Sequence, residues 1–322
     1  MTPNRPTVPE RAGDRPFAAV APPAPTTTSE ESVIVSAPPL SAGAGNPSAD
    51  CIADSAGGLT FDLDAPGRAA DAHWSAALVL RLRGRAEGEE EVRLPLTPNG
   101  DGRLRAVLPS TVALPEGRWD VHLACGEDTP RRLLPGLADL RSLIDRRPGP
   151  STSPLAVRIP YATKHGNLSL RSWQRAPHAE AGDVLVDPEG ITVRGTLYRV
   201  EDPGAWLAGA VVEARCRRAE LTVTAPLTAA GGQDFAFALP FAGLCAPWRG
   251  GPEVWDLWLR GPEGTPVRLA RILDDVADKK HVFVYPARDV TAPYAPAQAG
   301  PYYTADNDLS VRIGECPPGA GR

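Results

Sequence analysis

The residues best suited to chemistry cluster in one short stretch, IPYATKHGNLSLRSW. It places Lys164, His165 and Asn167 around a single glycine, with Tyr161 and Thr163 just before them. A histidine beside a lysine could act as a general base, and the same groups could bind a polar ligand through hydrogen bonds. The stretch therefore indicates a catalytic loop, a ligand-binding loop or a turn between strands.

Two acidic clusters could hold a metal ion. Asp62 and Asp64 have the DxD spacing with which some glycosyltransferases hold a divalent ion, but no nucleotide-binding α/β pattern surrounds them. We interpret them as the solvated end of a strand. Asp306, Asn307 and Asp308 could ligate Ca²⁺, yet they are few for this ion and are also typical turn residues. We predict no metal ion.

The motifs that identify common enzyme classes are missing from the sequence. Its five histidines form no HExxH or HxH pair, and no GxSxG, GxGxxG or Walker sequence occurs. His122 should share the outward face of a strand with Asp120, which we interpret as a surface pair and not as an acid–base pair. We predict no catalytic residue and no cofactor; if the chain is an enzyme, a transferase is the expected class.

The composition indicates a turn-rich globular protein. The 322 residues include 36 Pro and 31 Gly, which favours short strands over long helices. The net charge is -5 and shows no basic stripe of the kind that nucleic-acid-binding proteins carry. Five cysteines without CxxC or zinc-like spacing predict free, buried thiols. The excess of Arg over Lys is typical of a GC-rich bacterial genome.

The N-terminal 56 residues differ from the rest of the chain. Residues 1–56 are rich in Pro, Ala, Ser and Thr, which predicts a disordered leader, with Val33–Val35 as a candidate partner-binding strand. The sequence has neither the apolar core of a secretion signal nor the run of about 18 apolar residues of a membrane span. We expect a cytoplasmic protein, which could lie against the inner face of the cell membrane as a peripheral protein.

An internal repeat is the strongest signal in the remaining sequence. Matching segments keep their order, and the offset between them stays within 131 to 141 residues, as small loop insertions would produce. The repeat predicts two copies of one domain, at 57–175 and 182–315. The matched segments include GLTF 58–61 with GITV 190–193, WD 119–120 with WD 255–256, RL 132–133 with RL 268–269, PY 160–161 with PY 301–302, and LS 168–169 with LS 309–310.

Both copies show the two-residue period of β-strands. RWDVHLAC should turn Trp119 inward, and EVWDLWLR should turn Trp255 inward and Trp258 outward. Trp74 and Trp206 should begin matching strands, PNGDG should form a hairpin turn, and 134–146 should hold a short helix or 3₁₀ turn. The predicted fold class is all-β: two tandem immunoglobulin-like β-sandwich domains after a disordered N-terminal leader.

The repeat narrows the interpretation of IPYATKHGNLSLRSW. Its Pro, Tyr, Thr, Leu and Ser persist in the second copy, whereas Lys164 and His165 become Ala305 and Asp306. The shared residues should frame a turn into the last strand. We therefore predict a structural hairpin whose variable tip carries specificity, in place of a catalytic His–Lys pair.

Aromatic residues that should be exposed are the best lead to a ligand. Their rings could stack on sugar rings while nearby polar groups bind the hydroxyls. The alternative is that the rings pack between the repeats or under loops. The candidate ligand-binding residues are Trp258, Trp248, Tyr302, Tyr303 and Trp173, together with Lys164, His165, Asn167, Asp306 and Asp308.

Three segments carry a resemblance to a known group of domains: GRWDV 117–121, YATKHGNLS 161–169 and WDLW 255–258. They resemble the immunoglobulin-like β-sandwich modules attached to bacterial polyol-phosphate (teichoic-acid-type) transferases and family-2 glycosyltransferases. In that group the catalytic domains lie elsewhere in larger chains. The resemblance therefore implies an accessory or binding protein.

Three functions follow as hypotheses. The leading one is a non-catalytic protein of two β-sandwich modules that binds a glycopolymer or a transferase partner in cell-envelope glycan or polyol-phosphate metabolism. The second is a glycosyl or glycerophosphoryl transferase with its site between the repeats. The third is a scaffold that pairs through sheet edges. We favour the first, because the sequence shows no charged or nucleophilic constellation that both repeats keep.

Overall fold

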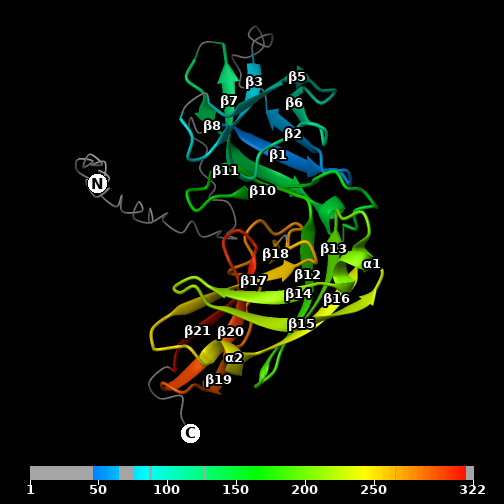
Figure 1. The fold of residues 1–322 in the computed structure, drawn as a ribbon. Helices are drawn as coiled ribbons and strands as arrows, with labels where there is room; N and C mark the ends of the chain where they lie inside the picture. Colours follow the sequence, from blue (N-terminus) through cyan, green and yellow to red (C-terminus); the bar gives the residue numbers. More distant parts are fainter. Residues whose placement is uncertain are drawn as a thin grey trace, which may run out of the picture. The chain divides into compact units, whose positions relative to one another are not determined.

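The computed structural model describes residues 46–64, 76–86, 89–126, 128–144, 146–264 and 266–316. The regular secondary structure of these residues is nearly all β-strand, as the sequence predicts, and the helices among them are short (Figure 1). Residues 1–45, which include Val33–Val35 and most of the expected leader, lie outside the described part. So does Trp74.

The first repeat consists of two sheets. One sheet has the strand order β5-β6-β2-β1-β9, and the other has the order β10-β11-β7-β3-β4, with β8 paired to β7. Strands that lie far apart in the chain are therefore neighbours. The strands are β1 (Ser48–Ala53), β2 (Leu59–Asp64), β3 (Ala76–Leu82), β4 (Glu91–Pro95), β5 (Thr97–Pro98), β6 (Arg103–Leu108), β7 (Gly117–Cys125), β8 (Arg131–Arg132), β9 (Leu134–Asp139), β10 (Leu155–Ala162) and β11 (Leu168–Arg175).

The first strand corrects the expected boundary of the leader. β1 lies between β2 and β9, and its Ala49, Cys51 and Ala53 are buried in the core. Residues 48–53 therefore belong to the folded domain, although we expected it to begin at residue 57. The polar residues around β1 hid it, because only alternate side chains of this strand face the core.

The second repeat forms a more continuous structure. β15 pairs with β14 and β16, β18 pairs with β12 and β17, and β14 also pairs with β17. Seven strands therefore close a barrel-like ring in the order β14-β15-β16-β13-β12-β18-β17. The strands are β12 (His178–Val186), β13 (Gly190–Tyr198), β14 (Val211–Cys216), β15 (Thr222–Gly231), β16 (Asp234–Pro240), β17 (Glu253–Arg260), β18 (Pro266–Ala270), β19 (Arg288–Thr291), β20 (Pro296–Tyr303) and β21 (Leu309–Glu315).

The two halves share one strand order, which the internal repeat predicts. The trio β1–β2–β6, with β9 parallel to β1, corresponds to β12–β13–β16, with β18 parallel to β12. The series β4–β3–β7–β11–β10 corresponds to β15–β14–β17–β21–β20. The second copy thus begins at His178, four residues before the expected start at 182. The immunoglobulin-like strand arrangement itself remains a prediction.

Each repeat has its own apolar core, and the inward faces follow the predicted alternation. Trp119 on β7 and Trp255 on β17 are fully buried in these cores. The first core continues into the second repeat through Ile272 and Leu273, which follow β18. All five cysteines are free thiols; three are buried, and Cys125 and Cys316 are half-buried.

Two local predictions are wrong or only partly right. Trp206 lies in helix α1 (Pro203–Ala208) and not in a strand: the side chain of Asp202 caps the helix by accepting a hydrogen bond from the Ala205 N–H, and Pro203 suits the first turn. Segment 134–146 contains strand β9 before its predicted 3₁₀ turn at Arg141–Leu143 (η2). A second short helix, α2 (Phe241–Cys245), precedes the loop that carries Trp248.

Candidate binding site on the outer sheet faces

Asp120 on β7 is the centre of a charged network on the outer face of the first repeat. Its neighbours Trp119 and Val121 point into the core, so the alternation of the strand turns Asp120 outward. Arg83 Nη2 lies 2.7 Å from Oδ1, and Arg132 Nη1 lies 2.9 Å from Oδ2. The network joins β7 to the end of β3 and to β8.

Ser169 on β11 completes this network. Its hydroxyl donates to Asp120 Oδ1 over 3.0 Å and accepts from Arg132 Nη2 over 3.1 Å. Ser169 is fully buried, although it lies on the outer face. A buried hydroxyl with both a donor and an acceptor partner fixes the positions of the charged groups around it.

Asp256 on β17 is the centre of the same network in the second repeat. Arg217 Nη2 lies 2.8 Å and Arg268 Nη2 lies 2.7 Å from Asp256 Oδ1. Ser310 donates to Asp256 Oδ1 over 2.8 Å and accepts from Arg268 Nη2 over 2.7 Å. The residue types and their hydrogen bonds are those of the first repeat.

The strand register shows that the two networks occupy equivalent places. Asp120 lies opposite Arg81 and Ser169 on its neighbouring strands, and Asp256 lies opposite Arg215 and Ser310. Our inference that no charged constellation is kept in both repeats is therefore wrong. Matched pairs such as WD 119–120 with WD 255–256 and RL 132–133 with RL 268–269 contain half of this constellation.

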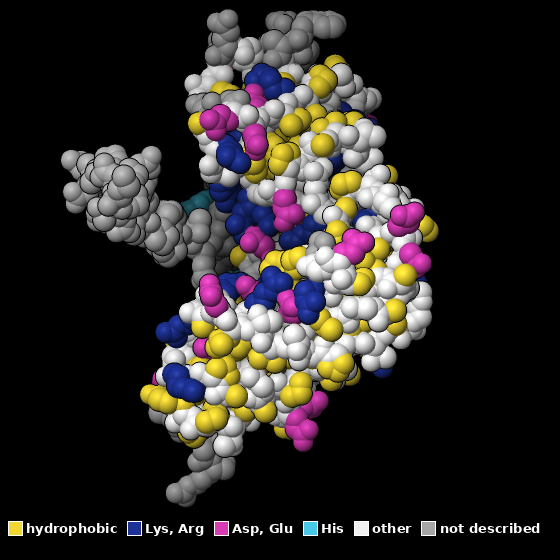
Figure 2. All heavy atoms as spheres, in the orientation of Figure 1, with side chains coloured by type: hydrophobic (Ala, Val, Ile, Leu, Met, Phe, Trp, Pro, Cys, Tyr) yellow, Lys and Arg dark blue, Asp and Glu magenta, His cyan; other side chains and the backbone are white. Residues whose placement is uncertain are grey.

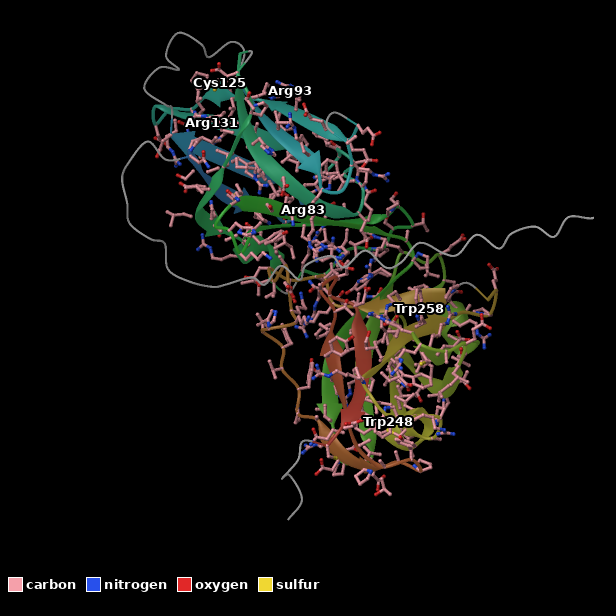
Figure 3. All side chains as sticks on the ribbon, turned by 90° about the vertical axis from the view of Figure 1, so that its left-hand side faces the viewer. Arg83, Arg93, Cys125, Arg131, Trp248 and Trp258 are labelled. Atoms are coloured by element: carbon pink, nitrogen blue, oxygen red, sulfur yellow. The ribbon has the colours of Figure 1, made fainter. Side chains whose placement is uncertain are left out.

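Each network carries an aromatic side chain at its edge. Trp258, two residues beyond Asp256, is half-buried, and its ring lies 5.0 Å from the Arg215 guanidinium carbon and 5.3 Å from that of Arg268. These contacts are cation–π interactions. The prediction that Trp258 points out of the core is confirmed, and Figure 3 shows it at the end of the second repeat away from Trp248.

His122 stands at the same place in the first repeat. It lies opposite Arg132 on β8, as Trp258 lies opposite Arg268 on β18. Its Nδ1 lies 3.3 Å from the backbone oxygen of Asp120, so it does not form an acid–base pair with that carboxylate. Burial, and then the charges of Arg132 and Arg81, lower the pKa of His122, which is therefore a neutral aromatic ring at neutral pH.

The carboxylates of both networks are held in their ionised form. Burial alone would raise the pKa of Asp120, but hydrogen bonds and charges from Arg83 and Arg132 outweigh it and hold that pKa below its usual value. The pKa of Asp256 is lowered in the same way by Arg217 and Arg268. Such carboxylates are poor bases, because guanidinium groups contact both oxygens of each one. The constellation is suited to binding and not to proton transfer.

Guanidinium groups outnumber carboxylates on these faces. On the first repeat Arg93 and Arg81 share Glu91, as Arg83 and Arg132 share Asp120. Figure 2 shows Lys and Arg side chains gathered across the middle of the face drawn, with Asp and Glu side chains among them. The second repeat repeats this arrangement, with Arg215 and Arg260 on Glu213.

Three of the aromatic candidates are buried, so our expectation that they are exposed is wrong. Trp248 and Tyr303 are fully buried in the second core, and Trp173 is fully buried in the first. Trp248 donates to the Gly251 oxygen over 2.9 Å, so its loop folds inward. Tyr302 is half-buried, with the Arg312 guanidinium 5.7 Å from its ring.

The tip of the second hairpin joins the repeats. Asp306 Oδ1 lies 2.7 Å from Arg171 Nη2 and 3.6 Å from Arg118 Nη2, and its backbone oxygen accepts from Trp173 Nε1 over 3.2 Å. We considered calcium binding at this tip, but the structure shows the Asp306 carboxylate in ion pairs with arginines. Lys164 and His165, at the matching tip of the first repeat, are exposed, and Asn167 is half-buried.

Asp308 continues the connection into the second network. Arg175 Nη2 lies 2.9 Å from Glu116, and its Nη1 lies 3.0 Å from Asp308, whose other oxygen lies 3.6 Å from Arg268 Nε. Arg268 in turn holds Asp256. A continuous series of alternating charges therefore runs from β11 of the first repeat to β17 of the second.

The remaining sequence candidates have structural roles. Asp62 is buried and accepts two 2.7 Å hydrogen bonds from Arg105, and Asp64 is largely exposed beside Arg103. Our interpretation of a solvated strand end holds for Asp64 and is wrong for Asp62. In the described part of the chain, no group of three or more His, Cys, Asp or Glu could hold a metal ion. No helix formed by these residues has the length and apolar character needed to cross a lipid bilayer.

Comparisons with known proteins give structural likenesses only. No protein-family model and no curated protein matches the sequence. The fold is similar to Staphylococcus aureus TarS 217–571 at 15% identity, covering 61% of this chain and 56% of that one, with a TM-score of 0.28. A second TarS structure covers 59% and 35% at a TM-score of 0.27 and 15% identity. The FN1–FN3 domains of chicken CNTN1 cover 69% and 63% at 10% identity and a TM-score of 0.17. None of these likenesses assigns the chain to a family.

Proposed function

We propose that this chain is a non-catalytic β-sandwich protein that binds an anionic glycan or polyol-phosphate polymer on its outer sheet faces. The observation that carries the proposal is the duplicated platform, an aromatic ring beside two arginines. In the first repeat it consists of Arg81, His122 and Arg132, and in the second of Arg215, Trp258 and Arg268. The link to polyol phosphates and cell-envelope glycans comes from the sequence resemblance.

The chemistry of the platform supports an anionic polymer as the ligand. Guanidinium groups bind phosphate in a planar, two-pronged geometry, and an aromatic face binds the C–H surface of a sugar or polyol. Two platforms on one chain offer two binding places to a repeating polymer, which would allow bivalent contact. Such bivalent contact raises the overall affinity well above that of either platform.

The proposal is tested by measuring the binding of poly(glycerol phosphate) to the full chain by calorimetry. Trp258→Ala should weaken binding about fivefold, because it removes an aromatic surface worth about 1 kcal/mol. Tyr294→Ala is the matched control, since Tyr294 is 60% exposed but lies near Trp248 and away from both platforms. Its affinity should equal that of the wild type.

Two results would contradict the proposal. One is an equal effect of the Trp258 and Tyr294 substitutions, and the other is the absence of binding at low ionic strength. The two alternative functions predict different results in the same preparation. A transferase with a site between the repeats would consume a nucleotide-activated donor, whereas a scaffold would bind a protein partner and leave the polymer unbound.

A further inference from the structure

The hairpin between β14 and β15 lines a hollow of about 460 Å³ that is largely open to solvent, next to the second platform. Its lining runs through Arg215–Thr222 and includes three arginines, Arg215, Arg217 and Arg218, against one carboxylate, Glu220. Arg215 also contacts the ring of Trp258. The hollow and the platform therefore share a residue.

The three arginines differ in how far the protein itself neutralises them. Arg215 pairs with Glu213 and Arg217 pairs with Asp256. Arg218 is exposed, and its Nη1 donates over 3.2 Å to the backbone oxygen of Pro252. A backbone oxygen carries no formal charge, so no carboxylate of the described residues pairs with Arg218 at the rim of the hollow.

The equivalent hairpin of the first repeat is built differently. There, Glu89 accepts a hydrogen bond from the Ala86 N–H, and Glu90 lies 3.8 Å from Arg85. The turn thus supplies carboxylates of its own. In the second hairpin, by contrast, the described residues show no ion pair between Arg218 and Glu220. The positive hollow is therefore not a requirement of the fold.

We propose that this hollow binds the phosphate group of a polyol or sugar phosphate, with Arg217 and Arg218 as the phosphate ligands and Trp258 beside the organic part. This inference rests on the proposed function and names the part of the polymer that the second repeat recognises. Guanidinium groups provide the several N–H donors that phosphate oxygens require. An aromatic ring at one side favours an organic phosphate over the free ion.

The test is a titration of the full chain with inorganic phosphate and with glycerol 3-phosphate at constant ionic strength, followed by calorimetry. Arg218→Gln should weaken the binding of both ligands about fivefold to tenfold. Arg249→Gln is the matched control, because Arg249 is also exposed and donates only to backbone oxygens, those of Ala246 and Trp248. It should leave both affinities unchanged, and Glu220→Gln should raise them.

Equal effects of the Arg218 and Arg249 substitutions would overturn the inference, as would binding that does not respond to Glu220→Gln. Tighter binding of glycerol 3-phosphate than of inorganic phosphate supports contact with the organic part, and the reverse order overturns that part of the proposal. If poly(glycerol phosphate) binds and Trp258→Ala weakens this binding, but Arg218→Gln has no effect, the inference that the hollow binds phosphate is wrong and the proposed function stands. If phosphate binds in the hollow but the polymer does not, the proposed function fails.

Discussion

His122 and Trp258 occupy one position in the two repeats: each lies directly opposite an arginine on the neighbouring strand, Arg132 or Arg268. The first platform therefore has the smaller ring. We expect His122→Trp to tighten the binding of poly(glycerol phosphate) about threefold to fivefold, because it adds aromatic surface beside two guanidinium groups. Val107→Trp is the control, as Val107 is half exposed on β6 of the other sheet. Equal gains in affinity from both substitutions would contradict the assignment of His122 to a binding platform.

Asp256 should matter for stability. Asp256→Asn leaves Arg217 and Arg268, which is largely buried, without their shared carboxylate. Breaking a partly buried ion pair from one side should lower the free energy of unfolding by about 2–3 kcal/mol. Urea denaturation measures this change. Asp64→Asn is the control: the side chain of Asp64 is 80% exposed beside Arg103, so its loss should cost below about 0.5 kcal/mol.

The lowered pKa values of Asp120 and Asp256 predict acid sensitivity. A carboxyl group whose pKa is lower in the folded than in the unfolded state stabilises the fold above its unfolded pKa of about 4. This contribution is lost as the pH falls through the folded pKa. The free energy of unfolding should therefore be steady between about pH 5 and 7 and should fall below about pH 4. The Asp120→Asn, Asp256→Asn double variant should show a shallower fall, and an identical pH profile would disprove this assignment.

The pair Arg175–Asp308 should couple the repeats energetically. Both side chains are less than one-fifth exposed, so a double-mutant cycle with Arg175→Gln and Asp308→Asn should give a coupling of about 1–2 kcal/mol in thermal or urea unfolding. The exposed pair Asp139–Arg141 is the control and should give a coupling below about 0.5 kcal/mol. Equal couplings would mean that the connection adds no stability.

The purified chain should not turn over nucleotide-activated sugars or polyols. The carboxylates of the two networks are neutralised by arginines, so no free base is positioned there. A coupled assay that detects release of the nucleotide measures this directly. Robust transfer that disappears on replacing His165 or Asp306 would establish an enzyme instead.

The strand pattern and the repeat were predictable from the sequence, but exposure in loops was not. The alternation of apolar residues around Trp119 and Trp255 follows the two-residue period of a strand, and this period is visible in the sequence itself. Trp248 lies in a Pro- and Gly-rich loop that suggested exposure. Its burial depends on α2 and on a hydrogen bond to Gly251, which no local pattern reveals.

The duplicated network was missed for a different reason. The residue types of Asp120, Arg132 and Ser169 all recur in matched segments, but each was read singly as a feature of the fold. Arg83 and Arg217 recur at an offset of 134, between the offsets already found, and would have completed the set. What the sequence could not supply is that these residues converge, because four different strands bring them together.

The ion pairs of Asp306 and Asp308 make the contact between the two repeats asymmetric, because the second repeat contributes its hairpin tip and the first contributes β11. The tip of the second repeat offers carboxylates, and β11 of the first repeat offers the arginines that bind them. The tip of the first repeat carries Lys164 and His165 where the second carries an alanine and Asp306. An arginine-lined strand like β11 would repel Lys164, so the first tip cannot form the contact that the second tip forms.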